Sequence, residues 1–217
     1  MTAEPIDVGT LPRHRLRLLI GDSGAWRDKL RFLGGFLRRP LQTSSVAPTT
    51  FANARRIVAR IRKPGRKVVV EFGPGTGVVA RALLASGRLT ADCLVILIET
   101  NREFAEALKR TLCDPRVRVV HDSAENVEVI LRRFGERHVD YVLCSIPLLI
   151  LTTAAQAQIL SATRRLLSAD GELIVFLFRK RVARLLEADF APVEPMSRLL
   201  WNIPPLVLFV VRRRQCP

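Results

Sequence analysis

Hydrophobic residues follow two alternating patterns over the last two thirds of the chain, and the two patterns predict two kinds of element. Short apolar runs predict strands, and longer segments with apolar residues three or four positions apart predict helices. The predicted strands are at 67–72, 93–99, 116–121, 139–145 and 172–178. The predicted helices are at 77–87, 101–112, 124–134 and 153–168. Strands that alternate with helices of this length predict an α/β fold in which a mostly parallel sheet carries helices on both faces.

Two more apolar runs, at about 193–201 and 206–213, close the chain. Residues 202–205 join them and include Pro204 and Pro205. This connection is too short for the crossover helix that parallel strands require, so it predicts an antiparallel hairpin. We therefore expect the sheet to end in an antiparallel strand.

The first 65 residues are organised differently. Residues 1–25 show no sustained periodicity and predict a loose, basic lead-in. Residues 26–40 predict an amphipathic helix with one apolar and one basic side. Its apolar side holds Trp26, Leu30, Leu33, Phe36 and Leu37, and its basic residues are Arg27, Arg31, Arg38 and Arg39. Residues 41–65 predict a connector and a second helix at about 49–62, and residues 66–217 form the α/β domain.

The chain of 217 residues carries a net charge of +15, with 35 Lys and Arg against 20 Asp and Glu. Most of the excess lies in residues 1–67, where 15 basic residues stand against four acidic ones. Such an excess predicts attraction to a polyanion, which is nucleic acid, an anionic membrane surface or an acidic protein. Charge alone leaves the choice among these partners open.

The four cysteines form no CxxC pair and have no histidine at ligand spacing, which disfavours a zinc site and a disulfide framework. We expect no metal and a reducing, cytoplasmic location. The start of the chain lacks the basic and apolar pattern of a signal peptide. The longest weakly polar stretch, 141–155, is shorter than the ~18 residues of a spanning helix, so no membrane span is expected.

A glycine-rich loop with the sequence EFGPGTG, from Glu71 to Gly77, follows the first predicted strand and precedes a helix. Glycines at alternate positions allow a tight strand-to-helix turn and let backbone N–H groups approach an anionic ligand at the helix N-terminus. The spacing lacks the GxGxxG pattern of dinucleotide sites and the GK[ST] end of a P-loop. The loop by itself therefore leaves the ligand unspecified.

Polar residues also stand at the ends of the next three predicted strands. Glu99 ends the second strand, Asp122 follows the third, and Ser145 ends the fourth. The carboxyl ends of the strands in an open α/β sheet form a ligand crevice. For a nucleoside ligand in this crevice, Glu99 is placed to accept hydrogen bonds from two ribose hydroxyls. Asp122 is placed to accept a hydrogen bond from the exocyclic amine of adenine. Asp122 has the alternative role of capping the helix near Ala124. Ser145 lies at the mouth, where a transferred group would be exposed.

Together, the EFGPGTG loop, Glu99 and Asp122 resemble the class I S-adenosylmethionine-dependent methyltransferases, over about 66–213. The resemblance implies a Rossmann-like sheet and S-adenosylmethionine as cofactor, with S-adenosylhomocysteine as its product. It also implies a cofactor site without a metal. The residues assigned to that site are Glu71, Phe72, Gly73, Gly75, Gly77, Glu99, Thr100, Asp122, Ser123 and Ser145.

Three shorter segments resemble the bacterial membrane-associated phospholipid N-methyltransferases: SSVAPTT at 44–50, CSIPL at 144–148 and WNIPP at 201–205. Two residues depart from that family's pattern, because His121 and Ser145 stand where Gly is usual. The resemblance implies stepwise methyl transfer to the amine of phosphatidylethanolamine and its methylated derivatives, toward phosphatidylcholine. The residues expected to orient the lipid amine are Ser45, Thr49, Thr50 and Ser145. No catalytic base is identified.

A lipid substrate also gives the basic N-terminal segment a role. A basic amphipathic helix with Trp and Phe on its apolar side suits the headgroup region of an anionic membrane. The helix at 26–40 is therefore expected to dock the enzyme on the inner leaflet as a peripheral monomer. The helix within 41–65 is expected to cover the cofactor site. The alternative for the docking helix is that its apolar stripe packs on the α/β domain.

Other functions fit parts of the same sequence. A ribosomal RNA adenine N6-dimethylase would share the methyl donor and the sheet, and would use the +15 charge on phosphates. That family carries an Asn and an aromatic ring after the fourth strand, where this chain has the run SIPL at 145–148. The run lacks both groups, which disfavours a flipped base as substrate. Methylation of another aminolipid or a small amine, and membrane binding without catalysis, stay open.

Overall fold

The computed structural model describes residues 51–177, 185–187, 190, 194–199 and 206–213, and all of them belong to one compact unit that spans 49–217. The helix predicted at 26–40 lies outside the described residues. Within the part of the chain that the structure describes, no helix is long and apolar enough to cross a membrane.

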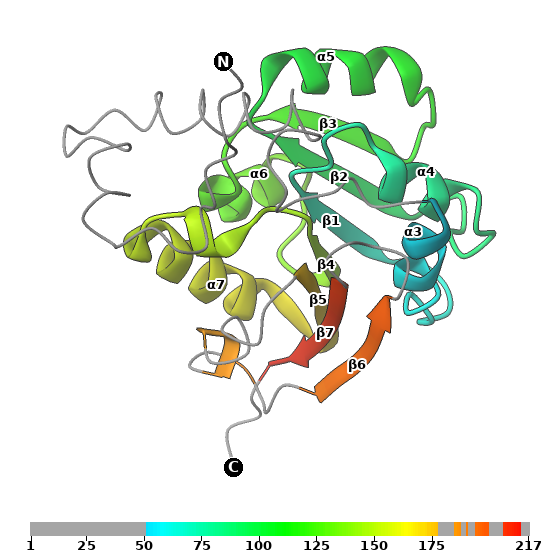
Figure 1. The fold of residues 1–217 in the computed structure, drawn as a ribbon. Helices are drawn as coiled ribbons and strands as arrows, with labels where there is room; N and C mark the ends of the chain where they lie inside the picture. The colour runs from blue at the N-terminus through cyan, green and yellow to red at the C-terminus, as the bar shows by residue number, and fades with distance from the viewer. Residues whose placement is uncertain (1–50, 178–184, 188–189, 191–193, 200–205, 214–217) are drawn as a thin grey trace, which may run out of the picture. The chain divides into compact units, whose positions relative to one another are not determined.

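The described strands form one seven-stranded sheet in the order β3-β2-β1-β4-β5-β7-β6 (Figure 1). Strands β1 to β5 pair in parallel, and β7 runs antiparallel to both β5 and β6. The strands are β1 (Val68–Phe72), β2 (Leu94–Glu99), β3 (Val117–His121), β4 (Val139–Cys144), β5 (Leu167–Leu177), β6 (Glu194–Leu199) and β7 (Leu206–Arg212). The predicted α/β class, with a mostly parallel sheet that ends in an antiparallel hairpin, is confirmed.

The strand order reverses at β1, which lies between β2 and β4. From β1 the chain moves outward to β2 and β3, and it then returns to the other side of β1 to build β4 and β5. Open α/β sheets bind ligands at such a switch point, beyond the carboxyl ends of the strands. The glycines of the EFGPGTG segment and Ser145 follow the carboxyl ends of β1 and β4, so the fold places them together there.

Helices cover both faces of the sheet (Figure 1). One face packs against α3 (Phe51–Val58), α4 (Val78–Leu84) and α5 (Arg102–Thr111). The other packs against α6 (Val127–Arg133) and α7 (Thr153–Leu166), with the short 3-10 helices η1 (Ala124–Asn126) and η2 (Leu148–Ile150). Because every residue of β1 is buried between these two layers, its sequence is an almost unbroken apolar run.

Two predicted boundaries differ most from the structure. Strand β5 begins at Leu167, whereas the apolar pattern placed its start at 172. Leu167 pairs with Val139, and the register then shifts before Tyr141 pairs with Glu172. This irregularity takes up the polar segment at 168–171, which has no alternating apolar pattern and therefore gives no strand signal. Helix α3 is also shorter than predicted at its carboxyl end.

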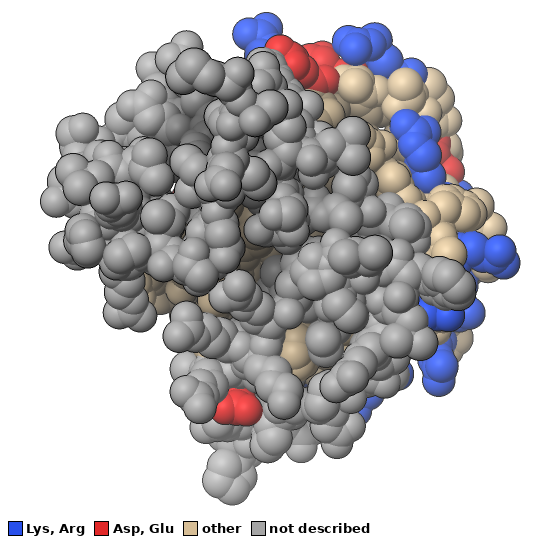
Figure 2. Space-filling model, in the orientation of Figure 1, with Lys and Arg blue, Asp and Glu red and all other residues tan. Residues whose placement is uncertain are grey.

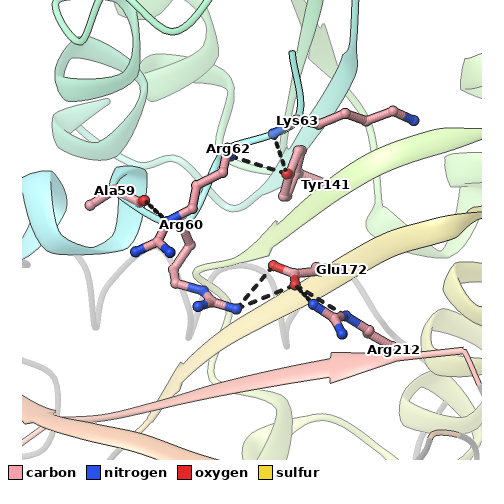
Figure 3. Close-up of polar contacts among 7 residues, drawn as sticks. All are labelled: Ala59, Arg60, Arg62, Lys63, Tyr141, Glu172 and Arg212. Carbon is pink, nitrogen blue, oxygen red and sulfur yellow. Dashed lines mark hydrogen bonds and ion pairs between the residues drawn. The ribbon is translucent and has the colours of Figure 1, made fainter.

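A polar network holds the segment between α3 and β1 against the sheet (Figure 3). Tyr141 is buried, as a core residue, and its hydroxyl accepts hydrogen bonds from the backbone N–H groups of Arg62 and Lys63 at 3.1 and 3.0 Å. The carboxylate of Glu172, beside Tyr141 in the sheet, accepts from two arginines, Arg60 at 3.3 Å and Arg212 at 2.7 Å. The network therefore joins the end of α3 to β4, β5 and β7.

Candidate functional site

The three glycines of the EFGPGTG loop have positive φ values, and their surroundings give them different roles. The φ angles are +66° at Gly73, +55° at Gly75 and +78° at Gly77, a region that glycine adopts without strain. A Cβ at Gly73 would lie 2.5 Å from Ile146 Cγ2, and one at Gly77 would lie 2.5 Å from Leu108 Cδ2. At Gly75 no atom of the described residues, apart from its two chain neighbours, would lie within 4 Å. Gly73 and Gly77 therefore allow close packing, and Gly75 leaves open space for a ligand.

Glu99 links the end of β2 to this loop. Its buried carboxylate accepts a hydrogen bond from the Gly75 N–H at Oε2, at 2.9 Å, and from the Asn101 N–H at Oε1, at 2.8 Å. Burial raises the pKa of Glu99, and the backbone hydrogen bonds oppose this rise. Each carboxylate oxygen has two lone pairs, so Glu99 keeps acceptor capacity for a ligand hydroxyl.

Asp122 and Ser123 lie at the end of β3, beside Glu99. The Asp122 N–H donates to the Glu99 carbonyl at 3.2 Å, and its Oδ1 accepts from the Ser123 N–H and from Asn126 Nδ2, each at 2.7 Å. The cap of η1 is Ser123, whose Oγ accepts from the Glu125 N–H. The capping role considered for Asp122 therefore belongs to its neighbour, and the adenine contact of Asp122 stays a prediction.

His121 takes the position before Asp122 where the resembling family usually has Gly. The side chain is exposed, and its Nε2 lies 3.0 Å from the carbonyl oxygen of Thr100. This contact joins the ends of β2 and β3. His121 therefore adds an imidazole to the edge of the site without displacing either carboxylate.

Glu71 and Ser145 form the contact that sequence reasoning missed. The Ser145 hydroxyl donates a hydrogen bond to Glu71 Oε1 at 3.0 Å, and the Ser145 N–H donates to the Phe72 carbonyl at 3.0 Å. Glu71 is 1% exposed, and its Oε2 has no hydrogen-bond partner among the described residues. Burial raises the pKa of Glu71 to about 8, and repulsion from Glu99 contributes, whereas the Ser145 hydrogen bond opposes the shift.

A family comparison determines the class of this site. A family model described as a methyltransferase domain matches residues 69–171, from β1 into β5. Residues 69–171 are a methyltransferase domain. The matched part includes the glycine loop, Glu99, Asp122 and Ser145, so the domain coincides with the predicted cofactor site.

Individual proteins resemble the methyltransferase domain at low identity. The ornithine lipid N-methyltransferase of Singulisphaera acidiphila is 27% identical over 146 residues, which are 67% of this chain and 75% of that protein. The structure of 1,6-didemethyltoxoflavin-N1-methyltransferase from Burkholderia thailandensis, with 1,6-didemethyltoxoflavin and S-adenosylhomocysteine bound, has a TM-score of 0.62 at 18% identity, covering 97% of this chain and 94% of that one. A TehB-like SAM-dependent methyltransferase from Corynebacterium glutamicum has a TM-score of 0.56 at 12% identity, with 87% and 97% covered.

The predicted class I S-adenosylmethionine-dependent methyltransferase is therefore confirmed. The domain brings the residues predicted to bind the cofactor to the carboxyl edge of one sheet, although their contacts with the cofactor stay predictions. The predicted acceptor residues Ser45, Thr49 and Thr50 lie outside the described residues, and so do the residues between 26 and 39 that are predicted to bind the membrane.

Apolar side chains flank Ser145 at the edge of the methyltransferase domain. Ile146 packs close to Gly73, and η2 then exposes Leu149 and Ile150, which are 42% and 44% accessible. The signal in the sequence is the run LLIL at 148–151, which continues after the strand has ended. The edge that carries the hydroxyl of Ser145 therefore also carries exposed apolar groups.

The described part of the methyltransferase domain contains three free cysteines, and one of them is buried next to Ser145 in the sequence. No cluster of three or more His, Cys, Asp or Glu side chains that could hold a metal occurs there. Cys93, Cys113 and Cys144 are free cysteines. Burial raises the pKa of the Cys144 thiol to about 12, so this thiol next to Ser145 stays protonated at neutral pH.

Proposed function

We propose that this chain is an N-methyltransferase for the amine headgroup of a membrane lipid, with S-adenosylmethionine as the methyl donor. The observation that carries the proposal is the similarity to an ornithine lipid N-methyltransferase over 146 residues. Phosphatidylethanolamine, the acceptor that the sequence motifs indicate, also presents an amine at the membrane surface. These two lipids are therefore the acceptors to test.

The edge around Ser145 supports a lipid acceptor over a nucleic-acid base. Residues 145–148 supply a hydroxyl and apolar side chains, with no amide and no aromatic ring. A flipped base needs a stacking partner and hydrogen bonds to its edge. The exposed Leu149 and Ile150 instead suit the apolar part of a lipid next to its headgroup.

The described residues fit the cofactor. The space beside Gly75 admits a ligand close to the backbone, and Glu99 has acceptor capacity for ribose hydroxyls. Asp122 lies next to Glu99, at the position proposed for adenine. S-adenosylmethionine, when bound, supplies an electrophilic methyl group on a sulfonium, so its site needs no metal.

Methyl transfer to an amine requires a neutral nitrogen that points along the line of attack. Holding the amine in a fixed orientation supplies much of the rate in such reactions. Ser145 is the described residue proposed for this role, because its hydroxyl stands at the carboxyl end of β4. Ser45, Thr49 and Thr50 are proposed to complete the acceptor site.

We further propose that residues 26–40 dock the enzyme on the inner leaflet of an anionic membrane. Among the described helices on this side, α5 mixes basic and acidic side chains, whereas α3 and α4 carry basic ones alone (Figure 2). The segment at 26–40 instead combines four arginines with a Trp and Phe stripe. Each basic residue near an anionic leaflet contributes about 1 kcal/mol of binding.

Charge reversal tests the docking segment. Replacing Arg27, Arg31, Arg38 and Arg39 by Glu should abolish sedimentation with anionic vesicles and leave cofactor affinity unchanged. The matched control reverses the same number of charges on the described helices, at Arg55, Arg56, Lys109 and Arg110. Equal loss of vesicle binding in both variants would reject the docking segment, because vesicle binding would then depend on the total charge of the protein.

A transfer assay tests the proposed activity. Labelled S-adenosylmethionine is supplied with anionic vesicles that contain phosphatidylethanolamine, ornithine lipid or no aminolipid, and in parallel with ribosomal RNA. The proposal expects label in the lipid fraction only when an aminolipid is present. Label in RNA alone would identify the dimethylase alternative, and label in neither lipid would reject the proposal.

A further inference from the structure

The polar network of Figure 3 lines a cavity of about 310 Å³. Small-molecule sites in proteins start at about 300 Å³, so this cavity has room for a small ligand. Tyr141, Glu172 and Arg212 line it from paired positions of β4, β5 and β7, and therefore share one face of the sheet. Tyr141 precedes Ser145 by four residues, which is about 13 Å along a strand, and the lining includes none of the residues assigned to the cofactor.

The arginines of this lining carry more positive charge than their carboxylate partner neutralises. Arg60 and Arg212 share one carboxylate, that of Glu172, at 3.3 and 2.7 Å. Arg62 donates its Nε to the carbonyl of Ala59 at 3.2 Å, and it has no acidic partner among the described residues. Two of the three guanidinium charges are therefore without a carboxylate of their own.

The remaining charged groups of the lining are Lys63 and Asp170. Lys63 forms an ion pair with Asp140, so it adds no further surplus. Asp170 is exposed, and water and salt screen its negative charge. The cavity therefore has an excess of positive charge, which attracts an anion.

Hydrogen-bond donors without acceptors belong to the same lining. Arg60 reaches Glu172 through Nη2, whereas its Nε is buried and has no hydrogen-bond partner among the described residues. The oxygen of Tyr141 accepts two backbone N–H bonds, and the described residues offer no acceptor to its own proton. A buried donor without an acceptor is destabilising, so a ligand with acceptor oxygens would satisfy these groups.

We propose that this cavity binds the phosphate group of a small soluble molecule. A phosphate monoester supplies several acceptor oxygens and up to two negative charges near neutral pH, which match the two surplus arginine charges. Guanidinium groups also bind phosphate through paired hydrogen bonds.

The position of the cavity favours a soluble source over a membrane headgroup. The edge proposed to meet the lipid lies at the carboxyl ends of the strands, beyond Ser145. The segment at 60–63, which supplies three of the basic side chains, instead precedes the start of β1. A bound phosphate would link this segment to β4 and β7, and it would do so whichever acceptor the enzyme methylates.

A titration with inorganic phosphate tests the site in the full chain. Tyr141 is the only tyrosine of the sequence, so an isotope label on tyrosine gives one ring signal, which reports on the cavity. Chloride holds the ionic strength constant, so general screening does not change during the titration. The Tyr141 signal should shift and saturate at millimolar phosphate. A signal that does not move would overturn the proposal.

Two variants and a matched control assign the binding to the cavity. Arg60→Gln removes the buried donor and leaves Glu172 paired with Arg212, and Arg62→Gln changes an exposed side chain. Hydrogen bonds to charged groups are strong, so each variant should bind phosphate about 10- to 100-fold more weakly. The control is Arg118→Gln on β3, which removes an exposed arginine that also donates to backbone carbonyls.

The comparison remains decisive if one variant does not fold, because Arg62→Gln can replace Arg60→Gln. Phosphate affinity equal to wild type in the folded variants would overturn the site. An equal loss in Arg118→Gln would also overturn it, because binding would then depend on total charge.

A vesicle measurement distinguishes the source of the phosphate. Sedimentation with vesicles that contain phosphatidic acid should be the same for wild type, Arg60→Gln and Arg118→Gln. A loss in Arg60→Gln alone would assign the cavity to a lipid phosphate and overturn the soluble ligand. None of these measurements needs methyl transfer, so their outcome is independent of the proposed function.

Discussion

The backbone N–H of Gly75 donates a hydrogen bond to Oε2 of Glu99 at 2.9 Å, and this contact joins the loop after β1 to the end of β2. The other carboxylate oxygen of Glu99 accepts from the N–H of Asn101, at the start of α5. One buried carboxylate therefore shapes the glycine loop and keeps lone pairs for a ligand.

Replacing Glu99 by Gln should weaken cofactor binding. The amide keeps one oxygen but brings an NH₂ group against the N–H of Gly75 or Asn101, so a backbone donor loses its acceptor. Hydrogen bonds to charged groups are worth about 1.5–3 kcal/mol, so we expect affinity for S-adenosylmethionine to fall about 10- to 100-fold. Isothermal titration measures the change, with exposed Glu103→Gln as control. Equal affinity in wild type and Glu99→Gln would exclude Glu99 from the cofactor site.

Alanine at two loop glycines should have opposite main effects. Gly73→Ala places a Cβ 2.5 Å from Ile146 Cγ2, so it should mainly lower the free energy of unfolding. Gly75→Ala meets no atom of the described residues within 4 Å, so its methyl group occupies the space left for a ligand and should mainly lower cofactor affinity. The positive φ costs both variants about 1–2 kcal/mol. Urea unfolding and titration separate the two effects. The pair Gly73→Ala with Ile146→Ala should recover the part of the stability that is lost to the clash, and failure to recover any would contradict the packing role.

Much of this fold could be predicted because the strands are buried on both faces. The run from Val68 to Val70 and the similar run in β2 gave their strands directly. The site was predicted where acids and glycines end those strands. The Glu71–Ser145 contact was missed because the residues lie 74 positions apart, and the strand order that pairs β1 with β4 has no local signal in the sequence. The start of β5 was missed because residues 168–171, which follow Leu167, have no alternating apolar pattern.

Glu71 should make stability fall as pH rises. Its pKa is raised from 4.5 to about 8 in the folded state, so the folded protein holds this proton more tightly than the unfolded chain. The resulting stabilisation is complete below about pH 4.5 and is lost as pH rises through about 8, at about 1.4 kcal/mol per pKa unit at most. Urea unfolding should show Glu71→Gln gaining stability over wild type between pH 5.5 and pH 9. A constant difference would show that Glu71 does not titrate in this range.

Tyr141→Phe should destabilise the fold and spare the site. The variant removes the acceptor of two backbone N–H groups, those of Arg62 and Lys63, and we expect a loss of about 1–2 kcal/mol in the free energy of unfolding. Tyr141 belongs to the network of Figure 3. It lies three residues before the carboxyl end of β4, and the candidate site lies beyond that end. Affinity for S-adenosylmethionine should stay at the wild-type value, and a parallel loss of affinity would show that the network supports the site.

Mass spectrometry of lipids after incubation with the purified chain tests the central claim most directly. Vesicles that hold phosphatidylethanolamine or ornithine lipid are incubated with S-adenosylmethionine, and the extracted lipids are compared with those from a reaction without enzyme. We predict aminolipid that is heavier by one or more methylene units, with the added mass on the amine. Unmodified aminolipids, under conditions in which the chain binds S-adenosylmethionine and the vesicles, would contradict the account.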